Sequence, residues 1–357
     1  MSDKSVSRMR LIQVGLGDFG QRWMEVVLEQ SGWEYAGIAT RNNAVRHSSG
    51  MRAGVPANRQ FQSLTDAFSS GIEADAVLIT TPYFNHTQDV LLALEHDMDV
   101  LVEKPLAGTW DEVAELAADP RLELRIVMVA ENYRYSDAAR YIRSVIQSDE
   151  LGNIEYVGIQ YFVRHEFAPS DWRNGYEYPV LIENATHHLD LLRYITGVNA
   201  VRVTSVPVPT RRTLPWPNPT ATVLIEMQNS LVVQFTASWA YPEFETPWEG
   251  QWRIQGSKGA ILWDRDSVRV SSTRRSEQLS FLSKDSDHTL RRTFAEFDEC
   301  VRERRTPNTD IRDNSRTIGI VFAAIESSRT GHPVRLADMP GYPLDKSAAL
   351  KYTEKGT

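Results

Sequence analysis

The chain has 357 residues, of which 41% are hydrophobic and 24% charged, and its formal net charge is −8 at pH 7. This length exceeds one ordinary core, so two domains are expected, and the acidic balance argues against nucleic acid or an anionic membrane as partner. No signal peptide or membrane span is expected, because no apolar run approaches ~20 residues. The single cysteine, Cys300, excludes an intramolecular disulfide and fits a cytoplasmic protein; its apolar helical neighbours predict a buried thiol.

The first part of the chain alternates short apolar strands with helices. Strands are predicted at residues 10–15, 34–40, 74–80, 99–105 and 125–130, and helices at 18–30, 87–96 and 109–119. Thr109 with Glu112 three residues later has the pattern of a helix N-cap. The alternation predicts an α/β fold, with a doubly wound parallel Rossmann sheet in residues 1–135.

The remainder, residues 136–357, has a different pattern. Strand-like runs lie at 154–166, 200–208, 221–241, 252–264 and 267–272, and several alternate in polarity around turn residues. This pattern predicts an α+β domain with a large, mostly antiparallel open sheet. The sheet contains Trp239, Trp252 and Trp263. Since a sheet face left uncovered tends to find a partner, a homodimer or homotetramer built on that sheet is expected.

A glycine-rich loop follows the first predicted strand. Gly15, Gly17 and Gly20 have G-x-G-x-x-G spacing, between a strand and an amphipathic helix, which is the context that a dinucleotide-binding loop requires. The spacing predicts that the backbone of this loop contacts a pyrophosphate. The expected cofactor-binding residues of the loop are Gly15, Leu16, Gly17, Asp18, Phe19 and Gly20.

The end of the second predicted strand lacks the acid that usually binds the ribose of NAD. Thr40, Arg41 and Asn42 occupy this place. A guanidinium can pair with a 2′-phosphate through two charge-assisted hydrogen bonds, so NADP is favoured over NAD. The alternative is that Arg41 is a solvated loop residue.

Polar residues also follow two later strands. Thr80, Thr81, Pro82 and His86 follow one, and are expected to line the cofactor. Glu103, Lys104 and Pro105 follow the other, where open α/β sheets bind ligands. Glu103 and Lys104 are therefore also expected to contact the cofactor, and Glu103 can alternatively orient Lys104. A buried acid–base pair is rarely a gain in stability, so a functional role for Glu103 and Lys104 is preferred to a structural ion pair.

Five segments, in their order, resemble the Gfo/Idh/MocA family of oxidoreductases. They are residues 75–86, 100–108, 131–143, 181–197 and 323–336. The resemblance implies a Rossmann domain, a C-terminal domain whose open sheet often forms an oligomer interface, and reversible NAD(P)-dependent oxidation of a secondary alcohol on a sugar or cyclitol. The lysine and histidine of the family fall on Lys104 and His187. Glu183 replaces the usual Asp, and Asp97 stands near the usual Gly, where Asp tolerates left-handed backbone.

The segment around His187 has two distinct helical faces. Glu183, His187, Asp190 and Tyr194 share one face, while His188 lies with the apolar residues and is expected to be a packed, hydrogen-bonded histidine. The spacing of Glu183, His187 and Asp190 permits a metal site. No metal is expected, because no second histidine cluster accompanies them and hydride transfer needs none.

The predicted catalytic residues are Lys104, His187 and Glu183. Lys104 would hold the substrate hydroxyl, His187 would act as base and Glu183 would orient it. Further expected substrate contacts are Tyr133, Arg134, Trp172 and Arg173, the last two being alternatively loop anchors.

Three functions are compatible with these residues. The first is an NAD(P)-dependent dehydrogenase or reductase for a sugar, sugar derivative or cyclitol. The second is a glycoside hydrolase that oxidises its substrate transiently with bound NAD. The third is a non-catalytic dinucleotide sensor, against which the presence of both Lys104 and His187 argues.

Overall fold

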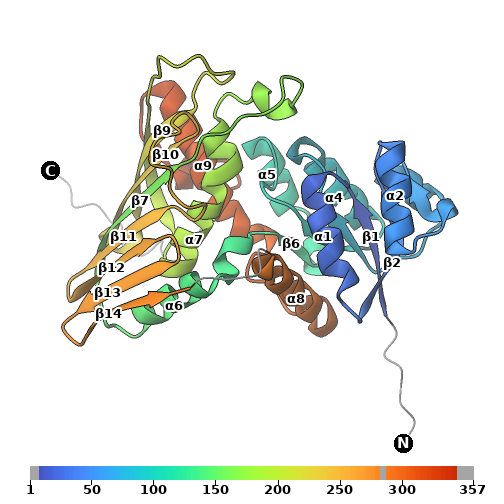
Figure 1. Ribbon diagram of the computed structural model, residues 1–357, viewed down its shortest axis with the longest axis horizontal. Coiled ribbons are helices and arrows are strands. Elements are labelled where there is room, and N and C mark those ends of the chain that lie inside the picture. The colour runs from blue at the N-terminus through green and yellow to red at the C-terminus, as the bar shows by residue number, and fades with distance from the viewer. Residues whose placement is uncertain (1–7, 282–286, 344–357) are drawn as a thin grey trace, which may run out of the picture. The chain divides into compact units, whose positions relative to one another are not determined.

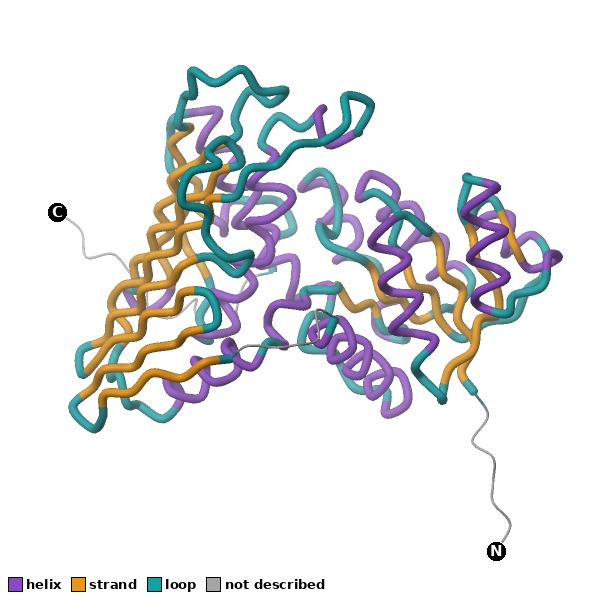
Figure 2. The backbone as a smooth tube through the Cα atoms, in the orientation of Figure 1, coloured by secondary structure: helices purple, strands orange, loops and turns teal. Residues whose placement is uncertain are grey.

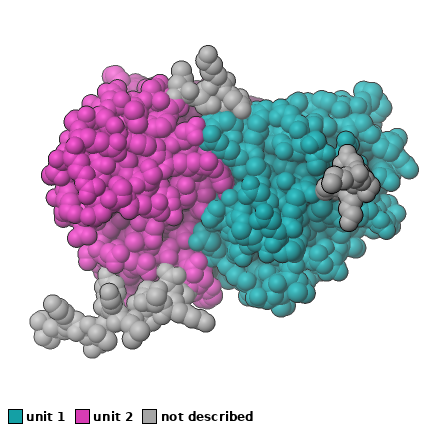
Figure 3. Space-filling model, turned by 90° about the horizontal axis from the view of Figure 1, so that it is seen from below, with its two compact units in different colours: residues 1–132, 285–314 teal, residues 133–284, 315–357 magenta. Residues whose placement is uncertain are grey.

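The computed structural model describes residues 8–281 and 287–343, which form two compact units (Figure 3). Of the described residues, the first unit contains 8–132 and 287–314, and the second contains 133–281 and 315–343. The first change of unit lies close to the predicted boundary at residue 135. The sequence did not predict that residues 287–314 return to the first unit.

The first unit is built on a six-stranded parallel sheet with the order β3-β2-β1-β4-β5-β6 (Figure 1). This confirms the predicted doubly wound sheet. The strand order reverses direction between β1 and β4, which is the switch point where sheets of this kind bind ligands at their carboxyl edge. The strands are β1 (Met9–Val14), β2 (Trp33–Ala39), β3 (Gln60–Phe61), β4 (Ala76–Ile79), β5 (Asp99–Val102) and β6 (Val127–Val129).

Within the described part of the chain, five α-helices connect these strands, and a sixth, α8, comes from a distant part of the chain. Thr109 caps one of them with a complete capping box to Glu112, as predicted. Trp33 packs against Phe294 and Phe297 of another, which explains why that distant segment joins this unit. The helices are α1 (Asp18–Leu28), α2 (Asn43–Ala53), α3 (Leu64–Ser69), α4 (His86–Glu95), α5 (Trp110–Ala117) and α8 (His288–Glu303).

The second unit is built on a nine-stranded sheet with the order β14-β13-β12-β11-β7-β10-β9-β8-β15 (Figure 2). Only β7 and β10 pair in parallel, so the sheet is mostly antiparallel, as predicted. The strands are β7 (Ile154–Phe162), β8 (Ala200–Pro207), β9 (Thr220–Met227), β10 (Val232–Ser238), β11 (Gln251–Gly256), β12 (Gly259–Asp264), β13 (Ser267–Ser272), β14 (Ser276–Ser280) and β15 (Val334–Arg335).

Among the described residues, the helices of this unit lie on one face of the sheet (Figure 1). The helices are α6 (Asp137–Gln147), a π-helix (Leu181–Ala185), α7 (Thr186–Thr196) and α9 (Ile311–Thr330), whose residues from Ser315 onward belong to this unit. Within the described residues, no helix combines the length and apolarity needed to cross a membrane.

The predicted homo-oligomer was expected to use a sheet face containing three tryptophans, but these tryptophans are not on the surface. Trp239, Trp252 and Trp263 are all buried within the unit, and Trp252 stacks on Trp263 across β11 and β12. They therefore contribute nothing to an exposed sheet face. Leu224 of β9 is an apolar side chain that does remain exposed. The homo-oligomer stays a prediction.

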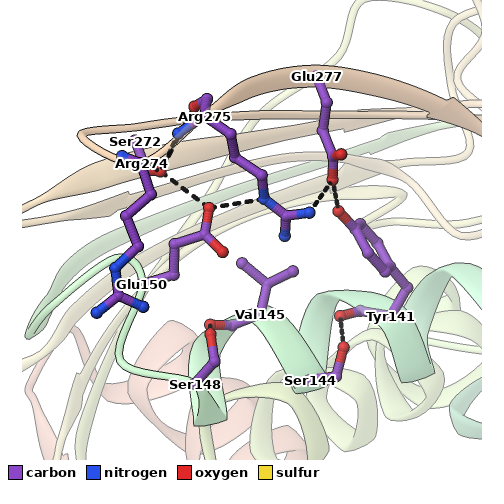
Figure 4. Close-up of polar contacts among 9 residues, drawn as sticks. All are labelled: Tyr141, Ser144, Val145, Ser148, Glu150, Ser272, Arg274, Arg275 and Glu277. Carbon is purple, nitrogen blue, oxygen red and sulfur yellow. Dashed lines mark hydrogen bonds and ion pairs between the residues drawn. The ribbon is translucent and has the colours of Figure 1, made fainter.

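A polar bridge fastens α6 to the β14 edge of the sheet (Figure 4). Arg275 lies between two acids: Nε donates to Glu150 Oε1 at 2.8 Å, and Nη1 pairs with Glu277 Oε1 at 2.7 Å. Glu277 also accepts the hydroxyl of Tyr141 from α6. The guanidinium holds the pKa of Glu150 below its ordinary value.

Candidate functional site

Two positions of the glycine loop between β1 and α1 have no room for a side chain. Gly15 has φ +88°, and a Cβ there would lie 2.5 Å from the carbonyl carbon of Thr80. A Cβ on Gly20 would lie 2.3 Å from Gly15 O. A Cβ on Gly17 would meet nothing within 4 Å, and Gly17 is the N-cap of α1 with no side-chain cap. The loop therefore offers backbone and open space at a helix N-terminus, which fits a dinucleotide pyrophosphate.

Side chains beneath the loop fix its path. Gln13, fully buried in β1, donates from Nε2 to Gly20 O at 2.7 Å and accepts the hydroxyl of Tyr35 at 2.7 Å. Thr80 donates its hydroxyl to Val14 O at 3.1 Å. Thr80 thus supports the loop, and its expected contact with the cofactor stays a prediction. Gln13 was missed, although a glutamine in an apolar strand was a signal that it has a polar partner.

The turn after β2 presents a cation and no carboxylate. Arg41 is exposed, and no described residue forms a side-chain hydrogen bond with it. Asn42 caps α2 by accepting Val45 N at 3.1 Å, and Arg46 donates to Thr40 O at 2.7 Å. Thr40 and Asn42 thus shape the turn, and the guanidinium of Arg41 projects from it.

His86 holds two strand ends together. Its ring nitrogens contact Pro105 O at 2.9 Å and Thr81 O at 2.8 Å, and the residue is buried. These contacts give His86 a structural role, and the expectation that it lines the cofactor stays a prediction. Thr81 donates its hydroxyl to Asp89 at 2.8 Å, and burial raises the pKa of Asp89 to about 6.

Lys104 follows β5 at the carboxyl edge of the parallel sheet. The preceding residue, Glu103, is only 7% exposed, and its carboxyl accepts Trp23 Nε1 at 2.7 Å and Lys104 N at 3.0 Å. Burial raises the pKa of Glu103 to about 7, while the charge of Lys104 opposes this shift. Glu103 is thus a buried carboxyl that fixes the backbone of Lys104, and its contact with the cofactor stays a prediction.

His187 lies in the first turn of α7, in the second unit. The predicted single helix is interrupted there, since a π-helix precedes α7. The ring of Tyr133 stacks on that of His187, with centroids 4.2 Å apart and planes inclined by 10°. Glu183, in the π-helix, accepts the hydroxyl of Tyr176 at 3.0 Å. The predicted base, His187, is therefore stacked on an aromatic ring, and the carboxylate of Glu183 is held by a hydrogen bond.

Arg134, predicted to contact the substrate, forms a buried ion pair. Its Nε donates to Asp190 Oδ2 at 2.8 Å and a second contact joins Nη2 to Oδ1, forming a bidentate pair. Arg134 is 5% exposed and Asp190 1%. The pair anchors the 3₁₀ turn at Asn132–Tyr135 to α7, and so holds Tyr133 near His187.

The neighbouring histidine has a different environment. His188 is fully buried, with Nδ1 2.9 Å from Asn184 O and Nε2 3.0 Å from Trp248 O. This agrees with the prediction of a packed, hydrogen-bonded residue. Asn184 also accepts Trp239 Nε1 at 2.6 Å, a long-range contact that the sequence did not predict.

Trp172 and Arg173 lie in a short 3₁₀ helix, Trp172–Gly175, in the segment between β7 and the π-helix. Trp172 is 37% exposed, and the guanidinium of Arg173 lies over its ring. Arg173 pairs with Asp171 at 2.9 Å. No described group of three His, Cys, Asp or Glu side chains could hold a metal ion.

Comparison with known proteins gives matches over both units. Residues 9–131 match the model described as "Oxidoreductase family, NAD-binding Rossmann fold", and residues 143–336 match "Oxidoreductase family, C-terminal alpha/beta domain". An uncharacterized protein of Sinorhizobium fredii, y4oX, is 24% identical over 92% of this chain and 96% of its own length.

Two further matches have more informative names. Inositol 2-dehydrogenase of Pseudarthrobacter chlorophenolicus is 27% identical over 43% of this chain and 44% of its own. An Agrobacterium radiobacter oxidoreductase, solved with NAD+, L-tartaric acid and magnesium, has a TM-score of 0.84 at 20% identity, covering 93% of this chain and all of that one. The structural likeness shows the fold, and the family models show the kinship: the chain belongs to the Gfo/Idh/MocA family of oxidoreductases, with a nicotinamide dinucleotide as its cofactor.

Proposed function

We propose that the protein is an NAD(P)-dependent oxidoreductase that transfers a hydride between the nicotinamide and a secondary alcohol or ketone of a sugar, sugar derivative or cyclitol. The position of Lys104 carries the proposal. It lies two residues after the end of β5, and β5 neighbours β4 at the carboxyl edge where the glycine loop also lies. An ammonium group at this edge can hold a hydroxyl or carbonyl oxygen at the reacting carbon.

The glycine loop supports the assignment of the cofactor-binding residues. Backbone from Gly15 to Gly20 would hold the pyrophosphate, and Thr81 and Pro82 would border the cofactor after β4. When bound, the nicotinamide accepts or donates the hydride. The exposed guanidinium of Arg41, in a turn without an acid, supports a preference for NADP over NAD.

We assign proton transfer to His187. Histidine is the side chain whose ordinary pKa lies nearest neutrality, so it can take the hydroxyl proton of an alcohol at physiological pH. Stacking on Tyr133 limits rotation of its ring, and Tyr176 fixes Glu183 one turn away. Lys104 then has the separate role of stabilising negative charge on the substrate oxygen.

The substrate class rests on kinship and on side chains. A relative named inositol 2-dehydrogenase supports a cyclitol or sugar. Trp172, with its exposed ring, supports the same class, because aromatic faces stack on the apolar faces of sugar rings.

The test is a panel of sugars, sugar derivatives and cyclitols offered to the intact protein with NAD or NADP, followed by nicotinamide absorbance. The expected result is net reduction of NAD or NADP in the presence of at least one polyol. Cleavage of a glycoside without net cofactor turnover would replace the proposal by the hydrolase alternative. Tight dinucleotide binding without any turnover, in either direction, would favour a sensor.

A further inference from the structure

The second unit holds an arginine between two aromatic rings. The Cζ atom of Arg173 lies 5.0 Å from the ring centroid of Phe167 and 4.7 Å from that of Trp172. Nη1 donates to the two carboxylate oxygens of Asp171, at 2.9 Å and 3.2 Å. The carbonyl of Arg173 accepts Trp216 Nε1 at 2.8 Å. Backbone and guanidinium are therefore both held in place before any ligand binds.

One edge of the Arg173 guanidinium has two N–H groups that donate to no described residue. Nη1 is occupied by Asp171, but Nε and Nη2 donate to no described residue. These two N–H groups point the same way and form the side-on edge with which arginine binds a carboxylate through two parallel hydrogen bonds. The side chain is 32% exposed, so a small molecule can reach it.

Two chains of contacts connect Arg173 to the π-helix that precedes His187. Next to it, Trp172 packs edge-on against Tyr176, with centroids 5.6 Å apart, and Tyr176 donates to Glu183. In the second chain, Trp216 packs on Trp239 at 5.1 Å, and Trp239 donates to Asn184. Arg173 is therefore anchored to the same short segment that positions the proposed base.

We propose that Arg173 binds a carboxylate of the substrate, which makes the substrate an acidic sugar derivative such as a uronic or aldonic acid. This inference rests on the proposed function and narrows its substrate class. Because the guanidinium is already ordered by Phe167, Trp172 and Asp171, little conformational entropy is lost when the acid binds. A neutral hydroxyl at the same edge forms weaker hydrogen bonds, since they lack the charge of the acceptor.

Arg212 provides a matched control in the same unit. It also lies over an aromatic ring, that of Tyr241, at 5.4 Å. Its Nη2, however, already donates to both carboxylate oxygens of Glu243, at 2.9 Å and 3.1 Å. Nη2 is thus occupied in Arg212, whereas Nε and Nη2 of Arg173 donate to no described residue. The effects of substituting the two arginines on acid binding can therefore be compared.

The experiment measures binding of matched acid–neutral pairs to the full chain with NADPH present, by calorimetry and tryptophan fluorescence. The probes are D-glucuronate against D-glucose, D-galacturonate against D-galactose, and D-gluconate against D-glucitol. At least one acid should bind roughly 10-fold or more tightly than its neutral partner. Arg173→Ala and Arg173→Gln should remove that preference by weakening the acid much more than its neutral partner, whereas Arg212→Ala should leave the preference intact.

The proposal is overturned if no acid in the panel is preferred, or if Arg173→Ala keeps the preference. Turnover of neutral sugars that does not depend on Arg173 would reject the acidic substrate while leaving the oxidoreductase standing. Acid binding that depends on Arg173, with no nicotinamide turnover for any compound, would reject the oxidoreductase and leave the carboxylate site standing.

Discussion

The indole Nε1 of Trp23 donates a 2.7 Å hydrogen bond to Oε1 of Glu103, across 80 positions of sequence. Trp23 belongs to α1, the helix that begins at the glycine loop, and Glu103 immediately precedes Lys104. The other carboxyl oxygen, Oε2, accepts Lys104 N. One buried side chain therefore ties the helix of the proposed phosphate site to the backbone of the proposed catalytic lysine.

Glu103 should make the protein less stable as pH rises towards neutrality. Burial raises its pKa from an ordinary 4.5 to about 7. Between these values the folded state keeps a proton that the unfolded state has lost, so stability falls with rising pH, by about 3 kcal/mol for this group. Gln at position 103 cannot titrate. Between pH 5 and pH 8, the thermal midpoint of Glu103→Gln should therefore fall less than that of the parent protein.

The matched control is Glu34→Gln, at an exposed position of β2 in the same sheet. It should keep the pH dependence of the parent protein. Identical profiles for the parent and Glu103→Gln would show that the carboxyl of Glu103 is ionised in both states, contrary to the shift described above.

Breaking the buried pair of Arg134 and Asp190 should be costly. Asp190→Asn leaves the Arg134 cation buried without its counter-charge, which should lower the free energy of unfolding by about 3–5 kcal/mol. The double change Arg134→Met with Asp190→Leu should be much milder, because no charge is stranded. Denaturant unfolding of each variant measures these differences.

An exposed pair on the same unit serves as the reference. Arg202 and Glu226 join β8 and β9 with both side chains substantially exposed, so Glu226→Gln should lower stability by less than about 1 kcal/mol. If Asp190→Asn is as mild as this control, then the Arg134 charge must be compensated by other groups.

Local patterns in the sequence predicted the parallel sheet, the glycine loop and the cap at Thr109, because each depends on residues only a few positions apart. Each of these elements is specified by short-range chemistry, so one chain was enough to find it. The turn near Asp97 was expected only from the family resemblance, and its φ of 58° shows that Asp accepts the left-handed geometry there.

Long-range partners could not be predicted in this way. Arg134 follows a strand end, where an arginine often binds ligands, and only the fold shows that it meets Asp190 on α7. The same holds for His86, whose ring contacts two backbone carbonyls. Asp190 was assigned to the site face of its helix because periodicity identifies a shared face and says nothing about what packs against it.

Arg41 should set the choice of cofactor. NADPH carries a 2′-phosphate that NADH lacks, and the exposed guanidinium can pair with it. The protein should therefore bind NADPH more tightly than NADH, and Arg41→Ala should narrow the gap by weakening NADPH alone. Calorimetric titration of both cofactors measures the ratio.

Arg59 offers a comparison for this change, since it is an exposed cation of the same unit that precedes β3. Arg59→Ala should leave the ratio of the two affinities unchanged. Equal or tighter binding of NADH by the unaltered protein would contradict the assignment of Arg41.

The division of roles between His187 and Lys104 gives the sharpest kinetic prediction. Oxidation of a secondary alcohol removes a hydride from carbon and a proton from oxygen, and the proton needs an acceptor near neutral pH. If His187 is that acceptor, His187→Ala should lower turnover by ~10²–10⁴-fold and abolish the acidic limb of the pH–rate profile, while dinucleotide affinity is largely kept.

Lys104→Ala should also lower turnover, since negative charge on the substrate oxygen loses its counter-charge, but the acidic limb set by His187 should remain. Both variants should be slow, so turnover alone does not identify the base. The pH–rate profile distinguishes the residue that accepts the proton from the residue that stabilises the charge. Tyr133→Leu removes the ring that stacks on His187 and should alter the same limb without removing it. If His187→Ala keeps near-normal turnover and an unchanged profile, Lys104 is the better candidate for the base, and burial or a neighbouring charge must then lower its pKa.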